Sequence, residues 1–368
     1  MEGARVIVLA TPVFLLLIAI EYAVGLARGR NTYRLNDAMS SIGLGMMSQL
    51  VGVFTKLFAV GVYTAVYEAA ALWHLPADAW WVWVGALILY DFFYYWHHRL
   101  GHECAVLWAA HAVHHQSEDY NLSTALRQTS TGWIGGWLFY LPMALLGVPP
   151  MVFAAVALID LLYQYWVHTQ QIGKLGWFDR VFCAPSNHRV HHAVNDRYVD
   201  KNYGGILIVW DRLFGTFEAE DDAQPCVYGT RSPLRSWNPL WANLQVYRDL
   251  WLDAWHARRW SDKLKVWFMP PGWRPADVAA RYPKPPFDIR QVRLYDPEVS
   301  RWAQVTAALL FLVLLGATAA FLWNAHLWSL PAQLGYAAAI IAGLWVVSAL
   351  TSGRERPAEA APPQGAAA

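Results

Sequence analysis

Charged residues are scarce in this chain of 368 residues. Lys, Arg, Asp and Glu together make up 15% of the chain, and their formal charges sum to only +1. A soluble domain usually carries about a quarter of its residues as charged side chains, so the composition argues against an ordinary soluble protein. The small net charge also provides no overall attraction to nucleic acid, and we expect no nucleic-acid partner.

Cysteine is scarce as well. The three cysteines, Cys104, Cys183 and Cys226, are far apart and form no CxxC pair. The sequence therefore predicts neither a disulfide framework nor a thiolate-ligated zinc site. We also find no Gly-rich dinucleotide-binding loop and no haem-binding domain, so electrons for a redox reaction would have to come from an external donor.

Hydrophobic residues are abundant, at 56% of the chain, and 22 residues are Trp, a residue enriched at membrane surfaces. A membrane-spanning helix needs roughly 20 apolar residues. The long apolar runs are 6–27, 39–72, 80–96, 132–168, 302–323 and 330–350. Within 132–168, the sequence Gly147-Val148-Pro149-Pro150 predicts a tight helical hairpin, because Pro can end one helix and open the next.

The distribution of positive charge predicts an orientation in the membrane. Lys and Arg gather in 28–34, in the histidine-rich segment after residue 96, and in 169–301, whereas 73–79 contains neither. Because positively charged loops remain in the cytoplasm, we predict about seven spans with the N-terminus outside. The run 39–72 is too long for one straight span and leaves this count open.

Together these features predict an all-α, polytopic membrane helical bundle with a cytoplasmic histidine-rich metal-binding cap. The predicted parts are N-terminal membrane spans in 1–79, a catalytic domain in 80–230, a cytoplasmic Trp/Pro-rich segment in 231–301, C-terminal spans in 302–350 and a disordered tail in 351–368.

Ten of the thirteen histidines lie between His97 and His192, and nine of them have the spacing of metal ligands. Residues three and four apart share one face of a helix, so each cluster presents two or three imidazoles to one point. The nine are His98, His102, His111, His114, His115, His168, His188, His191 and His192. Imidazole suits zinc, copper, iron and nickel. Nine donors are too many for one ion and suit two, although spacing does not distinguish iron from zinc.

Two acidic residues in the apolar runs are candidates for the active site. Asp91 lies two helical turns before His98, and Asp160 precedes His168 with Gln164 between them. A metal-bound histidine usually donates its other N–H to a carboxylate or a carbonyl, and a carboxylate within a span is costly and usually functional. We therefore predict that Asp91 and Asp160 belong to the active site.

The order of the histidine motifs resembles that of the fatty acid hydroxylase/sterol desaturase superfamily of integral membrane di-iron enzymes. Its pattern is HxxxH, HxxHH, a lone His and a second HxxHH, and this chain has all four in order. The resemblance covers roughly residues 80–230. The stretches that carry it include DFFYYWHHRLGHE, LWAAHAVHHQSEDYNLSTALRQ, VHTQQIGKLGWFD, PSNHRVHHAVN and DKNYGGILIVWDRLFGTFEAE.

The resemblance implies two Fe ions and the insertion of oxygen into a lipid C–H bond. It is strongest to the ether-lipid monooxygenases of the superfamily, which implies attack on the carbon next to an ether oxygen, with a tetrahydropterin as external reductant. It also implies active-site roles for Asn202, Tyr203, Asp211 and Glu218. Asn187 stands where the animal ether-lipid enzymes are expected to carry a histidine, and we include Asn187 and Glu218 among the candidate catalytic residues.

Our leading interpretation is a membrane di-iron monooxygenase that uses O2 to hydroxylate an ether lipid, a fatty acyl chain or a sterol. Two alternatives remain open at this point. The same di-iron site could desaturate a lipid or sterol, if a second hydrogen abstraction precedes the return of oxygen to carbon. A membrane metal transporter would also use histidines, but they would line a path through several spans, whereas here they lie at span ends and in loops.

Overall fold

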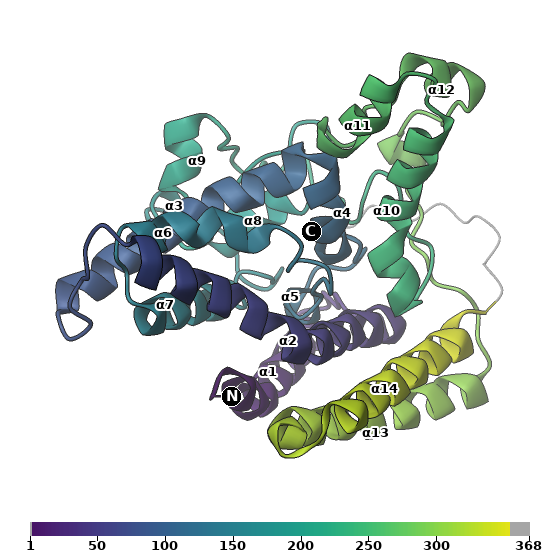
Figure 1. Ribbon diagram of the computed structural model, residues 1–368. Coiled ribbons are helices and arrows are strands. Elements are labelled where there is room, and N and C mark those ends of the chain that lie inside the picture. The colour runs from purple at the N-terminus through teal and green to yellow at the C-terminus, as the bar shows by residue number, and fades with distance from the viewer. Residues whose placement is uncertain (1, 354–368) are drawn as a thin grey trace.

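The computed structural model describes residues 2–353, and within this range it is helical, with two isolated bridges and no β-strand (Figure 1). The structure thus confirms the predicted all-α fold. Residues 354–368 of the predicted tail lie outside the described residues.

Within residues 2–353, four helical segments are long and apolar enough to cross a membrane. They are Arg5–Ala27, Leu35–Thr55, Arg301–Leu327 and Leu330–Thr351. The first two belong to helices α1 (Glu2–Ala27) and α2 (Leu35–Ala70), and the others are α13 (Arg301–Asn324), which continues into η4 (Ala325–Leu327), and α14 (Leu330–Thr351). These helices bury Met46, Leu50, Phe311 and Leu344 against one another and expose other large apolar side chains, as a lipid-facing bundle requires. The protein is therefore an integral membrane protein, as predicted.

The remaining predicted spans differ from expectation. The run 80–96 forms most of α3 (Trp80–Glu103), and 132–168 is divided among η1 (Gly136–Tyr140), α6 (Leu141–Leu145) and α7 (Pro150–Tyr163). None of these helices is among the four candidate spans, so the prediction of about seven spans is replaced by four within the described residues. Helix α3 contains many Trp, Tyr and His residues, which lower its hydropathy, and the 132–168 run is broken into helices too short to span.

The predicted hairpin turn is present in 132–168. Helix α7 begins at Pro150, and Gly147 has a left-handed φ of 83°. A Cβ on Gly147 would lie 1.8 Å from the carbonyl oxygen of Trp73, so only glycine fits this turn. The hairpin tip thereby packs onto the segment that joins α2 to α3.

The run 39–72 is part of one continuous helix, α2, of 36 residues. Its first half packs on α13 and α14, and its second half carries Tyr63 into a cluster with Val82 of α3, Met143 of α6 and Val152 of α7. Helix α2 thus joins the spanning bundle to the helices that lead to the histidines.

The histidine-rich part forms a cap of short helices. They are α4 (Ala105–His115), α5 (Leu122–Ala125), η2 (Phe178–Arg180), α8 (Pro185–His191) and α9 (Val209–Phe214), followed by α10 (Pro239–His256), α11 (Trp260–Phe268), α12 (Ala276–Arg281) and η3 (Ile289–Gln291). The cap is fixed to the bundle where Arg34, just before α2, pairs with Asp119 at 3.0 Å, and where Glu118 accepts the N–H of Tyr295.

Candidate metal centre

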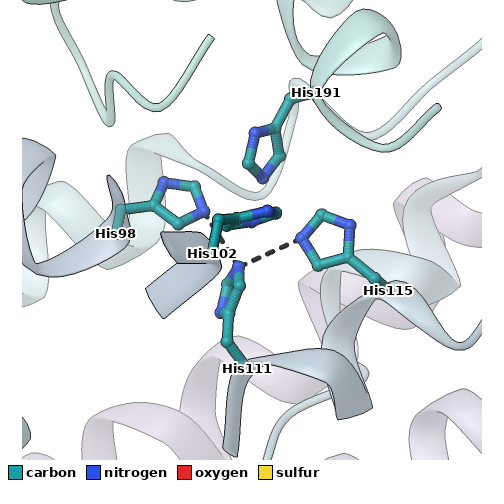
Figure 2. A group of neighbouring side chains, drawn as sticks. All are labelled: His98, His102, His111, His115 and His191. Carbon is teal, nitrogen blue, oxygen red and sulfur yellow. Dashed lines mark hydrogen bonds between the residues drawn. The ribbon is translucent and has the colours of Figure 1, made fainter. Parts of the chain in front are cut away.

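The structure brings all nine predicted histidines together in two adjacent groups. The first consists of His98, His102, His111, His115 and His191, and the second of His114, His168, His188 and His192. Within each group, one ring nitrogen of each histidine lies within 4.8 Å of those of the others. Figure 2 shows the five rings of the first group arranged around a common centre, with His98 and His102 coming from α3, His111 and His115 from α4, and His191 from α8.

Each HxxHH motif contributes to both groups. In α4, His111 and His115 are four residues apart and join the first group, whereas His114 joins the second. In α8 and its C-cap the arrangement is reversed, because His188 and His192 join the second group and His191 the first. Residues i and i+4 face one way and residue i+3 is rotated from them, so one short helix can supply ligands to two neighbouring ions.

The spacing of the nitrogens fits metal ions. The Nε2 atoms of His98 and His111 lie 2.9 Å apart, those of His111 and His115 3.0 Å, and those of His168 and His188 3.0 Å. Imidazole nitrogens bind first-row metals at about 2.0–2.1 Å, so two ligands of one ion are about 2.9–3.4 Å apart. Nitrogen lone pairs at this distance repel one another unless an ion or a proton lies between them, and the chemistry of this donor set therefore fits two ions.

Backbone carbonyls fix the other side of four imidazoles. In each case Nδ1 lies close enough to the carbonyl oxygen to donate its hydrogen, which leaves the lone pair of Nε2 free to bind a metal ion. The pairs are His98 with the carbonyl of Tyr203 at 2.8 Å, His114 with Arg127 at 2.9 Å, His168 with Gln164 at 2.8 Å and His191 with Lys201 at 3.0 Å. Sequence reasoning missed these partners, because any residue type can supply a carbonyl.

Burial keeps eight of the nine imidazoles neutral. It lowers the pKa of His114 to about 4, and it lowers the pKa of His98, His111, His115, His168, His188, His191 and His192 well below the ordinary value, with neighbouring imidazoles adding to the effect. Only neutral imidazole binds a metal, so the site is ready for metal at neutral pH.

We therefore expect metal binding to resist mild acid. Ordinary imidazoles, with a pKa of about 6.5, change from mostly neutral to mostly protonated between about pH 7.5 and pH 5.5. Here the lowered pKa values keep protons from competing over that interval, so the affinity of the metal-free protein for Co²⁺, followed by absorbance, should change little. A steep loss of affinity below pH 6.5 would show that the imidazoles titrate as exposed ones do.

A short segment with left-handed backbone orients two of these carbonyls. Asp200 and Asn202 both have a φ of 59°, and the carbonyls of Lys201 and Tyr203 face His191 and His98. Asn adopts this region more readily than most residues. The side chain of Asn202 is bonded to the backbone of Glu218 and donates to the carbonyl of Asn187 at 3.0 Å.

Asp211 holds the same segment from its other side. It is fully buried and accepts the N–H groups of Tyr203 and Gly204, each at 2.7 Å, and the hydroxyl of Thr216 at 2.6 Å. Asp211→Ala would leave the buried N–H groups of Tyr203 and Gly204 unpaired. We expect it to destabilise the protein by about 2–4 kcal/mol and to lower metal occupancy, measured by thermal unfolding and metal analysis. Asp211→Asn retains one acceptor oxygen and should lose less; equal stability of wild type and Asp211→Ala would contradict this role.

The carboxylates predicted to support the ligands bond to other groups. Asp91 accepts the N–H groups of Ile206 and Leu207 and the indole N–H of Trp210, and Asp160 accepts from Gln164. Neither forms a hydrogen bond with a histidine in the described part of the chain, so the expected carboxylate–histidine pairs are replaced by the carbonyl pairs. The physical reason is position. Asp91 lies two helical turns before His98, beside the 205–210 segment, and its carboxylate therefore bonds to that segment and not to a histidine.

Asn187 and Glu218 also support the site from a distance. The Asn187 side chain accepts the N–H of Ala184 at 3.0 Å at the start of α8, and the Glu218 carboxylate pairs with Arg197 at 2.8 Å. Their contribution to the metal centre passes through the backbone groups that hold Asn202. Their assignment as catalytic residues remains a prediction.

A cavity of about 340 Å³ leads from the spanning helices to the histidines. Apolar side chains of α1, α2 and α13 form much of its wall, including Phe14, Met46 and Leu322, and His98, His111, His114 and His168 lie along it. The volume is in the range of pockets that enclose small organic ligands. The arrangement therefore offers a metal centre that an apolar chain can reach. The nine histidines gather at one place, whereas a metal transporter would need them in series along a path through the membrane.

The four other histidines lie outside both groups. His97 lines the cavity and packs on Phe139 and Tyr140, while His74 packs on Tyr67 and His256 on Tyr282. His326 lies beside Arg5.

Comparison with known proteins supports this picture. A family model described as fatty acid hydroxylase matches residues 83–216, which include all nine histidines. The chain is 42% identical to the alkylglycerol monooxygenase of Homo sapiens over 72% of its length and 59% of the length of that protein. It is 39% identical to the alkylglycerol monooxygenase of Danio rerio over 83% and 68% of the two lengths, and 31% identical to the ornithine lipid hydroxylase OlsE of Rhizobium tropici over 36% and 40%. No solved structure matches the chain.

Proposed function

Because the chain belongs to the fatty acid hydroxylase family, we propose that it is a membrane monooxygenase that uses two Fe ions to hydroxylate a lipid. The observation that carries the proposal is the position of two histidine groups beside one apolar cavity. The reaction consumes one lipid C–H bond, O2, two electrons and two protons, and yields a lipid C–OH and water. Residues 80–230 are the catalytic unit.

The nine histidines would hold the ions, one in each group. When bound, iron supplies the chemistry that activates O2 and attacks an unactivated C–H bond. The task of the chain is to fix the two ligand sets through the carbonyls behind them, to keep the imidazoles neutral, and to exclude water. The four- and five-histidine sets also leave room for a further ligand on an ion that accepts six.

The cavity would hold the alkyl or acyl chain of the substrate among α1, α2 and α13. Holding one carbon beside the metal centre converts a random encounter into an oriented one, which supplies a large part of the rate advantage. The names of the relatives point to alkylglycerols and to a lipid with a polar head, and we favour an ether lipid. Hydroxylation next to an ether oxygen gives a hemiacetal, which opens to an aldehyde and an alcohol.

The metal centre would lie on the cytoplasmic side. Arg28, Arg30 and Arg34 follow the first span, and Arg34 is bonded to the cap through Asp119. The positive-inside rule then puts the cap in the cytoplasm, together with the Trp/Pro-rich segment 231–301. The electrons would come from an external donor, for which a tetrahydropterin or a partner redox protein is suitable.

Lipid analysis under ¹⁸O₂ tests the function directly. We would compare membranes that contain the wild-type chain with membranes that lack it, and search for lipids that gain one labelled oxygen or for aldehydes released from labelled hemiacetals. A lipid that gains a double bond and no label would instead identify a desaturase. No lipid change in cells that contain the iron-loaded protein would contradict the proposal.

A further inference from the structure

Three polar side chains in the wall of the cavity are joined to one another. The hydroxyl of Tyr94 donates to Oε1 of Gln164 at 2.6 Å, and Nε2 of Gln164 donates to Oδ2 of Asp160, also at 2.6 Å. All three residues line the cavity, whose wall is otherwise largely apolar. We call Tyr94, Gln164 and Asp160 the polar patch.

The polar patch lies one helical turn from a ligand of each histidine group. Tyr94 precedes His98 by four residues on α3, and the two ring centroids are 5.2 Å apart. Gln164 precedes His168 by four residues, and its backbone carbonyl accepts the imidazole Nδ1–H of His168. His98 belongs to the first group and His168 to the second. A substrate atom bound by the patch would therefore lie near both groups.

Asp160 has the surroundings of a neutral carboxylic acid. Asp160 is 2% exposed, its Oδ1 accepts no N–H or hydroxyl of the described residues, and its carboxyl group lies within hydrogen-bond reach of that of Asp91. A Cβ on Gly205 would lie 2.9 Å from this oxygen and 3.0 Å from Oδ1 of Asp91, so the two carboxyl groups face the same point. Asp91 already accepts three N–H groups. Two buried carboxyl groups this close to each other share one proton, so the acid group of Asp160 is directed to Asp91, and its Oδ2 remains the acceptor that fixes Gln164.

Away from the histidine groups, the wall of the cavity also lacks positive charge. None of the described residues that line it is a Lys or an Arg, and Asp160 is its single carboxyl group. A buried anionic group without a cation carries a large desolvation cost. Around the polar patch, the wall therefore has no cationic side chain to pair with a carboxylate or a phosphate, and it suits a lipid whose buried oxygen is uncharged.

We propose that the polar patch binds an uncharged oxygen of the lipid, an ether or hydroxyl oxygen, and thereby selects the carbon that is oxidised. The second N–H of Gln164 donates to that oxygen, Asp160 and Tyr94 hold the Gln164 amide in place, and the neighbouring carbon then lies beside the two histidine groups. This inference rests on the proposed function and adds the substrate atom that is recognised and the residues that recognise it.

Two lipids of equal length test the proposal. One is an alkyl ether lipid, and the other is its analogue with CH2 in place of the ether oxygen. The wild-type holoenzyme should prefer the ether in kcat/KM. One hydrogen bond corresponds to roughly a 5- to 10-fold preference, and this preference should disappear in Asp160→Leu and in Gln164→Met. Asp160→Asn keeps an oxygen that accepts from Gln164 and should retain most of the preference, and Tyr336→Phe, on α14 outside the cavity, should match wild type.

A purely structural role gives a different result. If the patch only joins α3 to α7, its substitutions lower the rates with both lipids equally and leave the preference unchanged. An unchanged preference in Asp160→Leu with full iron content would overturn the proposal. If Asp160→Leu loses iron, Gln164→Met decides by the same criterion.

Equilibrium binding separates this inference from the proposed function. Radiolabelled ether lipid and its CH2 analogue, bound to the purified holoprotein without reductant, should show the same preference and the same loss in the variants. If the wild-type protein oxidises neither lipid but binds the ether more tightly, the proposed function fails while the binding site stands. Equal binding of the two lipids by wild type would refute the binding site.

Discussion

His114→Ala should abolish lipid oxidation and reduce the iron content from about two ions per chain to about one. His114 is central to the second group, where its Nε2 lies 3.1 Å from Nε2 of His168 and its ring packs on His192. Its removal leaves three imidazoles for that ion and an empty space where the Arg127 carbonyl had fixed a ligand. Loss of a residue that merely orients a ligand already costs 10- to 100-fold in metal affinity or activity, so we expect activity to fall by more than about 100-fold.

Metal analysis and turnover measured on the same preparation check this prediction. His256→Ala is the matched control, because His256 lies on α10, packs on Tyr282 and belongs to neither group. It should keep wild-type iron and activity. Full activity of His114→Ala would contradict the ligand assignment, and loss of iron from His256→Ala would show that the boundaries of the centre are wrong.

Ala319→Phe should block the cavity while leaving the metal centre intact. Ala319 lies on α13 and lines the cavity together with Leu315 and Leu322. A phenyl ring there occupies space that the substrate chain would need, and overpacking of this kind costs about 1–3 kcal/mol. That free energy corresponds to a decrease in kcat/KM of roughly 5- to 150-fold for a long-chain lipid.

The neighbouring residue provides the control for Ala319→Phe. Ala320 is exposed on the same helix and does not line the cavity, so Ala320→Phe should have wild-type kinetics. Both variants should keep their iron, because α13 supplies no ligand. Wild-type kcat/KM of Ala319→Phe with a long-chain lipid would show that the substrate does not occupy this cavity.

The histidine ligand set could be predicted from the sequence because it depends on local geometry. The i, i+3 and i, i+4 spacings of His111, His114 and His115 fix relative directions on one helix whatever the tertiary fold. The same spacing allows each HxxHH motif to divide its histidines between two groups. Which histidine joins which group depends on how α4 and α8 are placed relative to each other, and the spacing does not determine that placement.

The supporting groups and the number of spans could not be predicted in the same way. Backbone carbonyls orient His98 and His191. Asp200 and Asn202, whose backbone is left-handed, position these carbonyls, and only the resemblance to a family drew attention to this segment. Asp91 was predicted to lie behind a ligand because two helical turns separate it from His98, but the 205–210 segment packs against it first. Helix α3 is long enough to span, but its polar and charged residues lower its hydropathy, and the 132–168 run is broken into helices too short to span.

The metal content of the purified wild-type chain tests the central claim most directly. Our account predicts about two irons per chain, determined by mass spectrometry of protein purified from membranes under conditions that retain tightly bound metal. A single ion per chain, or zinc that exchanges readily in place of iron, would contradict a two-iron oxygenase built from these nine histidines.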